Sequence, residues 1–272
     1  MIVTTIVATA LALSAIMAGA WFAQYRTRNS GWSDVFWSYE MGIGGVFLAL
    51  VPWNGTLHAP SARQVLVAIL VAIWSIRLGT HILQRTLSSK AEDPRYAALR
   101  EEWKDDFQSR LFWFLQIQAL AAFVLVVSVG IAAHNPAPGI RVLDIFGAFV
   151  LIAAIFGEGV ADTELRQFAA DKTNKGKICD AGLWGWSRHP NYFFEWLGWL
   201  AYPIIAINVS GAYFWGFLAL SGPIFMFWLL RYVSGVPPLE AHMIKKHGGN
   251  FRAYQERVSA FFPWPPRPKD IS

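Results

Sequence analysis

The chain has 272 residues, of which 55% are hydrophobic and 15% charged, with 14 Trp, 20 Phe and a formal net charge of +5 at pH 7. A soluble globular domain has about 25% charged residues. The composition therefore excludes an ordinary soluble domain and favours a protein whose solvent is the lipid bilayer. The one cysteine, Cys179, excludes an intrachain disulfide and a metal cluster built on cysteines.

Several stretches are apolar over about the 20 residues that a helix needs to cross the hydrocarbon core. They do not alternate between polar and apolar residues, as the strands of a membrane barrel would. The first stretch lacks the basic start and the short apolar core of a secretory signal peptide, so we expect it to remain as a spanning helix. The sequence predicts an all-α polytopic membrane protein, a single integral-membrane domain over residues 1–272. Its seven transmembrane helices are expected at residues 2–23, 35–53, 64–84, 111–133, 142–160, 192–209 and 212–230.

Lys and Arg are distributed unequally between the connecting loops. One side holds only Arg63 and Arg141, Arg77 lies inside a predicted span, and all other basic residues lie on the opposite side. The positive-inside rule then places the N-terminus outside and the C-terminus in the cytoplasm. This topology accounts for the positive charge without a nucleic-acid partner. The long connections 85–110 and 161–191 lie on the cytoplasmic side, so we expect polar ligands to bind there.

The C-terminal part of the chain begins at Leu239 as a basic amphipathic helix, breaks at Gly248 and Gly249, and ends in a proline-rich extended segment. Two interpretations stay open. The helix lies on the membrane surface with its lysines reaching the headgroups, or it covers a cofactor site as a lid.

Ionisable side chains inside a span cost about 2.5–3.5 kcal/mol on insertion scales and usually face a cavity or a partner. In the second span, Asp34 immediately precedes the apolar run and fits a helix N-cap. Glu40 lies about 9 Å further along the helix, next to Tyr39. A neutral or ion-paired Glu40 in an apolar pocket can act as a hydrogen-bond donor or a proton source.

In the third span, Arg77, His81 and Arg85 follow one another at i, i+4 and i+8 and share one helical face. Such a stripe is typical of one wall of an anion-binding or proton-carrying cavity. The structural alternative is ion pairing, for example between Arg77 and Glu40 on the neighbouring helix, and the two interpretations are compatible.

In the fifth span, Glu158, Asp162 and Arg166 share a face with the same spacing. The last two can form an i, i+4 surface ion pair worth a few tenths of a kcal/mol. That interpretation does not account for Glu158, which lies deeper in the span.

The stretch "GWSRHPNYFFEW" leads into the sixth predicted span and includes its first residues. Pro190 fits the first turn of a helix and pushes His189 toward extended geometry. A helix N-terminus beside Arg188 favours a phosphate, while Asn191 and Glu195 on one face favour a carboxamide or a ribose. We expect no metal site, because no second His or Cys lies at ligand spacing from His189. The chain also lacks the glycine motif of a Rossmann fold.

These motifs are similar to those of a known family. "SRHPNYFFEW", preceded by "ADTELRQFAADKTNKGKICDAGLW", resembles the C-terminal signature of the steroid 5α-reductase superfamily, in particular its bacterial membrane-protein branch. The resemblance extends to "IWSIRLGTHILQR", "EDPRYAALREEW" and "SGVPPLEAHMIKKHGGNFRAYQERVSAFFPWPP", and covers roughly residues 30–268. Isoprenylcysteine carboxyl methyltransferases and sterol reductases carry similar pieces.

The resemblance implies a seven-helix enzyme of a bacterial inner membrane, a monomer that binds NADPH from the cytoplasm and reduces a lipophilic enone, such as a 3-oxo-Δ4-steroid or another isoprenoid. Asp162 and Arg166 match the family's cofactor-contacting pair, and Asn191 and Glu195 match its Asn-Tyr-x-x-Glu motif. The main cofactor region is expected at residues 161–268. The implied cofactor-binding residues are Arg95, Glu158, Asp162, Arg166, Arg188, His189, Asn191, Tyr192, Glu195 and His242.

The catalytic positions depart from the animal steroid reductases, which carry a Gln-Glu pair in the second span and a Tyr in the third. Here the second span offers Tyr39 and Glu40, and the third has no tyrosine. We expect Glu40, assisted by Tyr39 or His81, to hydrogen-bond the substrate carbonyl. A membrane methyltransferase that uses S-adenosylmethionine is the first alternative, and a transporter that uses the polar stripes as a proton path is the second.

Overall fold

The computed structural model describes residues 2–53, 59–88, 92–208 and 211–268, and the regular secondary structure in these ranges is helical throughout. The predicted all-α fold is thus confirmed for this part of the chain. The chain divides into two compact units. Unit 1 comprises Met1–Ala148 with Tyr202–Gly222, and unit 2 comprises Phe149–Ala201 with Pro223–Ser272.

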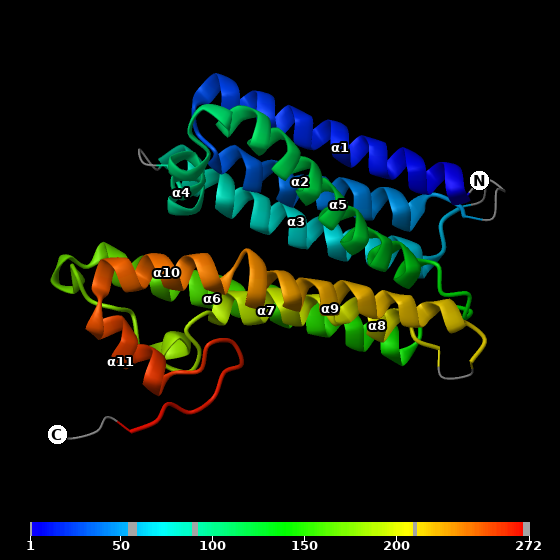
Figure 1. Cartoon of the computed structure of the whole chain (residues 1–272). Helices are drawn as coiled ribbons and strands as arrows, with labels where there is room; N and C mark the ends of the chain where they lie inside the picture. Colours follow the sequence, from blue (N-terminus) through cyan, green and yellow to red (C-terminus); the bar gives the residue numbers. More distant parts are fainter. Residues whose placement is uncertain (1, 54–58, 89–91, 209–210, 269–272) are drawn as a thin grey trace. The chain divides into compact units, whose positions relative to one another are not determined.

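Unit 1 is built on long helices that lie along one another in Figure 1. They are α1 (Ile2–Thr27), α2 (Gly31–Leu50), α3 (Ala62–Ser88) and α5 (Phe107–Ala133). Helix α2 packs against the other three. The short helix α4 (Pro94–Trp103) lies between α3 and α5 in the chain. The core of this bundle is formed by fully buried aliphatic side chains, among them Leu13, Met17, Met41, Leu48, Leu111, Leu115 and Leu125.

Helices α2 and α3 approach each other closely at Gly42. A methyl group there would lie 2.2 Å from the Oγ atom of Ser75. The Ser75 hydroxyl donates in turn to the backbone oxygen of Ser38 at 2.8 Å. Small residues permit such close contact between membrane helices, where packing and interhelical hydrogen bonds replace the hydrophobic effect as the source of stability.

We expect Gly42→Ala to lower the free energy of unfolding by about 1–3 kcal/mol, because the added methyl group overpacks this contact. Thermal unfolding of the detergent-purified protein measures the effect. Gly249→Ala is the matched control, because a Cβ atom at that position meets no atom within 4 Å. Equal unfolding temperatures for the two variants would contradict the tight contact.

Unit 2 contains most of α6 (Val142–Ala170) and all of α7 (Pro190–Trp199). Most of α9 (Ser221–Trp228) also belongs to it and continues through a π-helical turn at Leu229–Val233. Helices α10 (Val236–His247) and α11 (Gly249–Arg257) follow. The predicted break of the C-terminal helix is confirmed: α10 ends at His247, and the next residue, Gly248, has a φ of +55°, a backbone conformation that glycine adopts readily.

Among the described residues, 5 helices are long and apolar enough to cross a membrane. This is the character of an integral membrane protein. The helices are Ile2–Thr27, Ala62–Ser88, Pro94–Ala133, Val142–Ala170 and Phe214–His247. They include or overlap five of the predicted spans. The span predicted at 35–53 corresponds to α2, which ends at Leu50 and is not among these helices.

The membrane span predicted at 192–209 is not one continuous helix in the described residues. Helix α7 ends at Trp199, and the separate short helix α8 (Ala201–Ala206) follows. Pro203 has no N–H to donate to the carbonyl of Trp199, four residues earlier, so the hydrogen-bond ladder is interrupted there. Pro223 likewise leaves the carbonyl of Ala219 without its usual donor, and the Ser128 hydroxyl donates to that oxygen at 3.1 Å.

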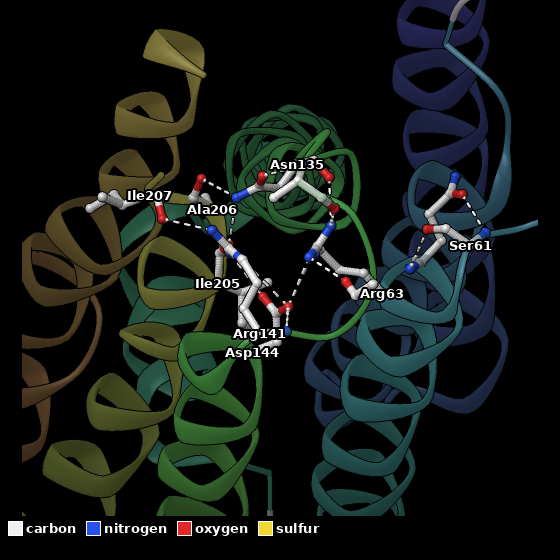
Figure 2. A network of polar contacts seen from close by, with 11 residues as sticks. Ser61, Arg63, Asn135, Arg141, Asp144, Ile205, Ala206 and Ile207 are labelled. Atoms are coloured by element: carbon white, nitrogen blue, oxygen red, sulfur yellow. Dashed lines mark hydrogen bonds and ion pairs between the residues drawn. The ribbon is translucent and has the colours of Figure 1, made fainter. Parts of the chain in front are cut away.

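One end of unit 1 is held by a network centred on Arg63 and Asp144, shown in Figure 2. The guanidinium of Arg63 donates to the Asp144 carboxylate at 2.9 Å and 3.1 Å. It also donates to the backbone oxygens of Asn135, Ala137 and Gly139, each at 2.7 Å. One side chain thus ties the start of α3 to the start of α6 and to the loop before it.

The same Asp144 carboxylate accepts from Arg141 Nη2 at 2.8 Å. Arg141 also donates to the carbonyls of Ile205 and Ile207, and Asn135 Nδ2 donates to those of Ile205 and Ala206 at 3.0 Å and 2.8 Å. These carbonyls lie at the C-terminal end of α8, where no further turn supplies donors. The two basic residues that stood apart in the sequence therefore share one acid, and their role here is structural.

Candidate functional site

Glu40 lies in the middle of α2 and is completely buried. Neither of its carboxylate oxygens has a hydrogen-bond partner in the structure. The predicted ion pair with Arg77 is therefore wrong. Buried polar groups are almost always hydrogen-bonded, so this carboxyl is a candidate contact for a ligand.

Tyr39 points from α2 to α3. Its hydroxyl lies 3.1 Å from the Thr80 hydroxyl, and its ring packs over Gly79, where a Cβ atom would come within 2.8 Å. No hydrogen bond joins it to the Glu40 carboxylate. His81, the other predicted assistant, follows Thr80 on α3. Their assisting role stays a prediction, while the packing of Tyr39 on α3 is a structural role that the sequence did not indicate.

Asp34 does not cap α2, so that prediction is wrong. The N-cap residue is Ser30, and Asp34 lies one turn into the helix. Its carboxylate accepts from the Arg95 guanidinium and, at 2.9 Å, from the Tyr96 hydroxyl. Arg95 also donates to Asp93, which caps α4. Arg95, predicted to contact the cofactor, therefore holds α4 against α2 in this structure.

A second ion pair secures the same short helix. Glu92 accepts from Arg100 at 2.7 Å and from the Ser30 hydroxyl at 2.5 Å. Burial raises the pKa of Glu92, but the hydrogen bonds from Arg100 and Ser30 outweigh burial and place that pKa below its ordinary value of 4.5. Burial likewise opposes the hydrogen bonds from Arg95 at Asp93, whose pKa is also lowered. Both acids are thus charged when α4 is in place.

Acid is expected to loosen α4. A carboxyl with a lowered pKa in the folded protein contributes stability above its unfolded pKa, and this stability is lost as the pH falls through the folded pKa. For Glu92 and Asp93 the loss begins below the ordinary values of 4.5 and 3.8. Hydrogen exchange of α4 amides should therefore accelerate below about pH 4 relative to α5, after correction for intrinsic exchange rates. In Glu92→Gln the acceleration should be smaller; an unchanged profile would contradict the assignment.

In unit 2, the predicted site residues of α6 differ in how far they are exposed to solvent. Glu158 and Asp162 are buried, whereas Arg166 is exposed. Arg166 donates to the backbone oxygen of Asp162 and to the Thr163 hydroxyl. Glu164, on the same helix, accepts from the Leu183 amide at 2.9 Å and so fastens the loop that leads toward α7.

Helix α7 begins at Pro190 as predicted, whereas His189, with φ −139° and ψ 60°, does not have the extended geometry predicted for it. His189 is the N-cap residue and Pro190 occupies the first helical position. The His189 amide donates to the Ser187 hydroxyl, and the His189 ring stacks on Tyr192 with centroids 5.5 Å apart. Asn191 Oδ1 accepts from the Tyr192 amide. This turn presents several polar groups over a short distance along the chain.

The buried Glu195 lies further along α7. Its carboxylate accepts from Trp199 Nε1 at 2.9 Å, one turn later. His242, predicted from a looser match, is half-buried on α10. Both residues remain predicted cofactor contacts.

Glu240, on α10, joins the start of α7 to the C-terminal tail. Its carboxylate accepts from Arg188 Nε at 2.7 Å, from His189 Nε2 at 3.1 Å and from Gln255 Nε2 at 2.7 Å. Arg188 also donates to the carbonyls of Gln255 and Val258. Sequence reasoning missed Glu240, because it lies 51 residues from His189 and no local pattern connects them.

His189 has one side of its ring committed to Glu240. Burial lowers the pKa of His189, although the hydrogen bond to Glu240 opposes the shift. The ring is therefore neutral at pH 7, and we assign its proton to Nε2 because Glu240 accepts there. Its Nδ1 atom is buried and has no hydrogen-bond partner. That atom is an available acceptor for a ligand.

The predicted residues are divided between the units. The catalytic set and Arg95 belong to unit 1. The other nine predicted cofactor-binding residues belong to unit 2. The residues of unit 2 come from α6, the start of α7 and α10.

A cavity of about 950 Å³ also lies in unit 2, and none of the predicted residues lines it. It is bounded by the loop after α6, by α11 and by the tail, with Lys177, Asp180, Tyr254, Arg257 and Arg267 among its lining residues. Arg257 is paired with Asp180 at 2.8 Å across it.

Comparison with known proteins identifies a family to which the chain is similar. A family model described as "Protein of unknown function (DUF1295)" matches residues 20–258. An uncharacterised protein of the fission yeast Schizosaccharomyces pombe, C594.04c, is 25% identical over an alignment of 289 positions, gaps included, that covers 93% of this chain and 78% of the relative. No solved structure matches the chain.

Proposed function

The chain belongs to the DUF1295 family, and we propose that it is an NADPH-dependent membrane reductase of lipophilic substrates with a C=C bond conjugated to a carbonyl. A 3-oxo-Δ4-steroid or another isoprenoid enone is the proposed substrate class. The observation that carries the proposal is the buried Glu40, whose carboxylate oxygens have no hydrogen-bond partner among the described residues. The similarity of the C-terminal motifs to the steroid 5α-reductase superfamily supplies the proposed cofactor.

Glu40 is the proposed electrophilic group. When a hydride adds to the β-carbon of an enone, negative charge develops on the carbonyl oxygen. A protonated carboxyl group placed at that oxygen donates a hydrogen bond that strengthens as the charge grows, and this lowers the barrier. The apolar surroundings of α2 exclude water, which strengthens the interaction further. Tyr39 and His81 remain the proposed assistants.

The side chains of unit 2 fit a dinucleotide in part. His189 Nδ1 is a buried acceptor without a partner, and Asn191 and Tyr192 lie within one turn of it. We propose that these groups, with Glu158, Asp162, Glu195 and His242, bind the polar groups of the cofactor. NADPH, when bound, supplies the hydride. Arg166, which is exposed, is the available phosphate ligand, because the Arg188 guanidinium already donates to Glu240 and to the tail.

Ligand-dependent stability tests the cofactor. A ligand at 100 times its Kd stabilises the folded protein by about 2.7 kcal/mol. NADPH should therefore raise the unfolding temperature of the detergent-purified protein, and Asn191→Ala should reduce the shift. Asn174→Ala, in the loop after α6, should keep it. Stabilisation by S-adenosylmethionine and none by NADPH would overturn the reductase and favour the methyltransferase.

We also propose a topology of seven spans, with the N-terminus outside and the C-terminus in the cytoplasm of a bacterial inner membrane. The asymmetric distribution of Lys and Arg supports it. A fluorescent-protein fusion after Ser272 should then fluoresce, and a fusion to periplasmic alkaline phosphatase should be inactive. The reverse pattern would contradict the orientation.

A further inference from the structure

The chain after α11 returns to the residues that precede α7. The Arg188 amide donates to the Ser259 carbonyl at 2.8 Å, and the Trp264 amide donates to the Trp186 carbonyl at 3.0 Å. The Ser187 hydroxyl donates to the Phe261 carbonyl at 2.8 Å. Residues 259–264 therefore run beside 186–188, directly in front of the first turn of α7.

Aromatic side chains leave this contact in two directions. Phe261 is buried and packs on Phe193 and Trp196 of α7 and on Phe227 of α9. Phe262 packs on the same three rings but is 47% exposed, whereas Trp264 is 71% exposed and Trp186 49%. Trp186 and Trp264 are adjacent through their backbone hydrogen bond.

The exposed rings lie where apolar helices of unit 2 begin or end. Trp186 precedes α7 by four residues. At the other helix, the ring of Phe227 contacts both Phe262, at 5.8 Å, and Tyr232, at 6.0 Å. Tyr232 is itself exposed and lies at the junction between apolar α9 and the more polar α10. Trp and Tyr side chains gather at this depth in membrane proteins, because an apolar ring with a polar edge suits the headgroup layer.

We propose that residues 259–267 lie in the headgroup layer of the bilayer, anchored by Trp186 and Trp264. The occupant of this surface is a phospholipid interface. Charge agrees with that partner, because the exposed Arg267 and the half-exposed Arg231 flank the rings and can reach lipid phosphates. Pro263, Pro265 and Pro266 keep the segment extended, so it lies along the surface instead of forming a further helix. This inference does not depend on the proposed reductase activity.

Depth measurement in lipid tests the proposal. Trp264→Cys and Trp186→Cys are each made in a Cys179→Ser background, labelled with an environment-sensitive fluorophore and reconstituted into phosphatidylcholine–phosphatidylglycerol nanodiscs. Nitroxide-labelled lipids then quench from a shallow or a deep position. Both labels should be quenched more strongly by the shallow nitroxide and be protected from aqueous iodide.

Two reference positions calibrate the depth. Phe156→Cys, on the lipid-accessible side of α6, should be quenched more by the deep nitroxide, and Arg252→Cys, exposed on α11, should respond to iodide alone. If the label at position 264 is quenched by iodide alone, like the label at 252, the tail lies in water and the proposal is overturned. Agreement between the labels at 186 and 264 excludes a local distortion caused by one substitution.

Discussion

Glu40→Gln is expected to reduce turnover of an enone substrate by up to about 10²–10³, the usual cost of losing one donor to a developing oxyanion, because the amide N–H is a weaker donor than a protonated carboxyl group and cannot supply a proton. The substitution keeps the size of the side chain and removes its acidic proton. Steady-state kinetics with NADPH, together with the thermal shift produced by NADPH, measure the effect. The thermal shift should stay unchanged, because Glu40 is proposed to contact the substrate carbonyl and not the cofactor.

Two further variants delimit the role of Glu40. Glu101→Gln, on the exposed side of α4, is the matched control and should keep full activity. Tyr39→Phe removes the hydroxyl that meets Thr80. A loss of turnover in Tyr39→Phe as large as in Glu40→Gln would establish Tyr39 as the assisting group. Full activity of Glu40→Gln on a confirmed substrate would refute the catalytic assignment.

Asp144→Ala is expected to lower the free energy of unfolding by about 3–5 kcal/mol, the cost of leaving a buried charge without its partner. Asp144 and Arg63 are both buried, and Arg141 shares the same carboxylate. Equilibrium unfolding in mixed detergent micelles measures the change. Asp105→Ala, at an exposed position in the turn between α4 and α5, is the control and should change stability little.

The double variant Arg63→Met with Asp144→Leu separates charge from packing. Because it removes both charges of the pair, no charge is left buried without a partner. It should therefore recover part of the unfolding free energy that is lost in Asp144→Ala. Recovery should be incomplete, because the carbonyls of Asn135, Ala137 and Gly139 lose the donor that Arg63 supplies. A double variant as unstable as the sum of both single ones would show that the residues act independently.

The existence of the long helices could be predicted because an apolar run of sufficient length needs no knowledge of its neighbours. The predicted 2–23 and 64–84 fall within α1 and α3. The break between α7 and α8, within the predicted span 192–209, was not predicted, although Pro203 is visible in the sequence. Pro203 interrupts the helix because it has no N–H to donate to the carbonyl four residues earlier. A search for apolar stretches does not detect this missing hydrogen bond.

Polar contacts over long sequence separation could not be predicted. Asp34 was assigned to its own helix end, yet its partners Arg95 and Tyr96 are 61 and 62 residues away. Arg188 was assigned to a phosphate, and the structure gives its guanidinium to Glu240 instead. In each case the residue type indicated an ionic contact, while the partner depended on which helix ends meet.

The sequence by itself determined that this protein suits a lipid environment, that it is helical and that α7 starts at Pro190. It also showed that the second apolar stretch contains an acidic residue, Glu40. These follow from local properties, namely apolar length, charge cost and the missing N–H of proline. Only the tertiary structure decided that Glu40 lacks a partner, that Arg63 and Arg141 share Asp144, and that Trp264 lies beside Trp186. Such contacts join segments far apart in the chain, and packing of the helices selects them among many partners of similar chemistry.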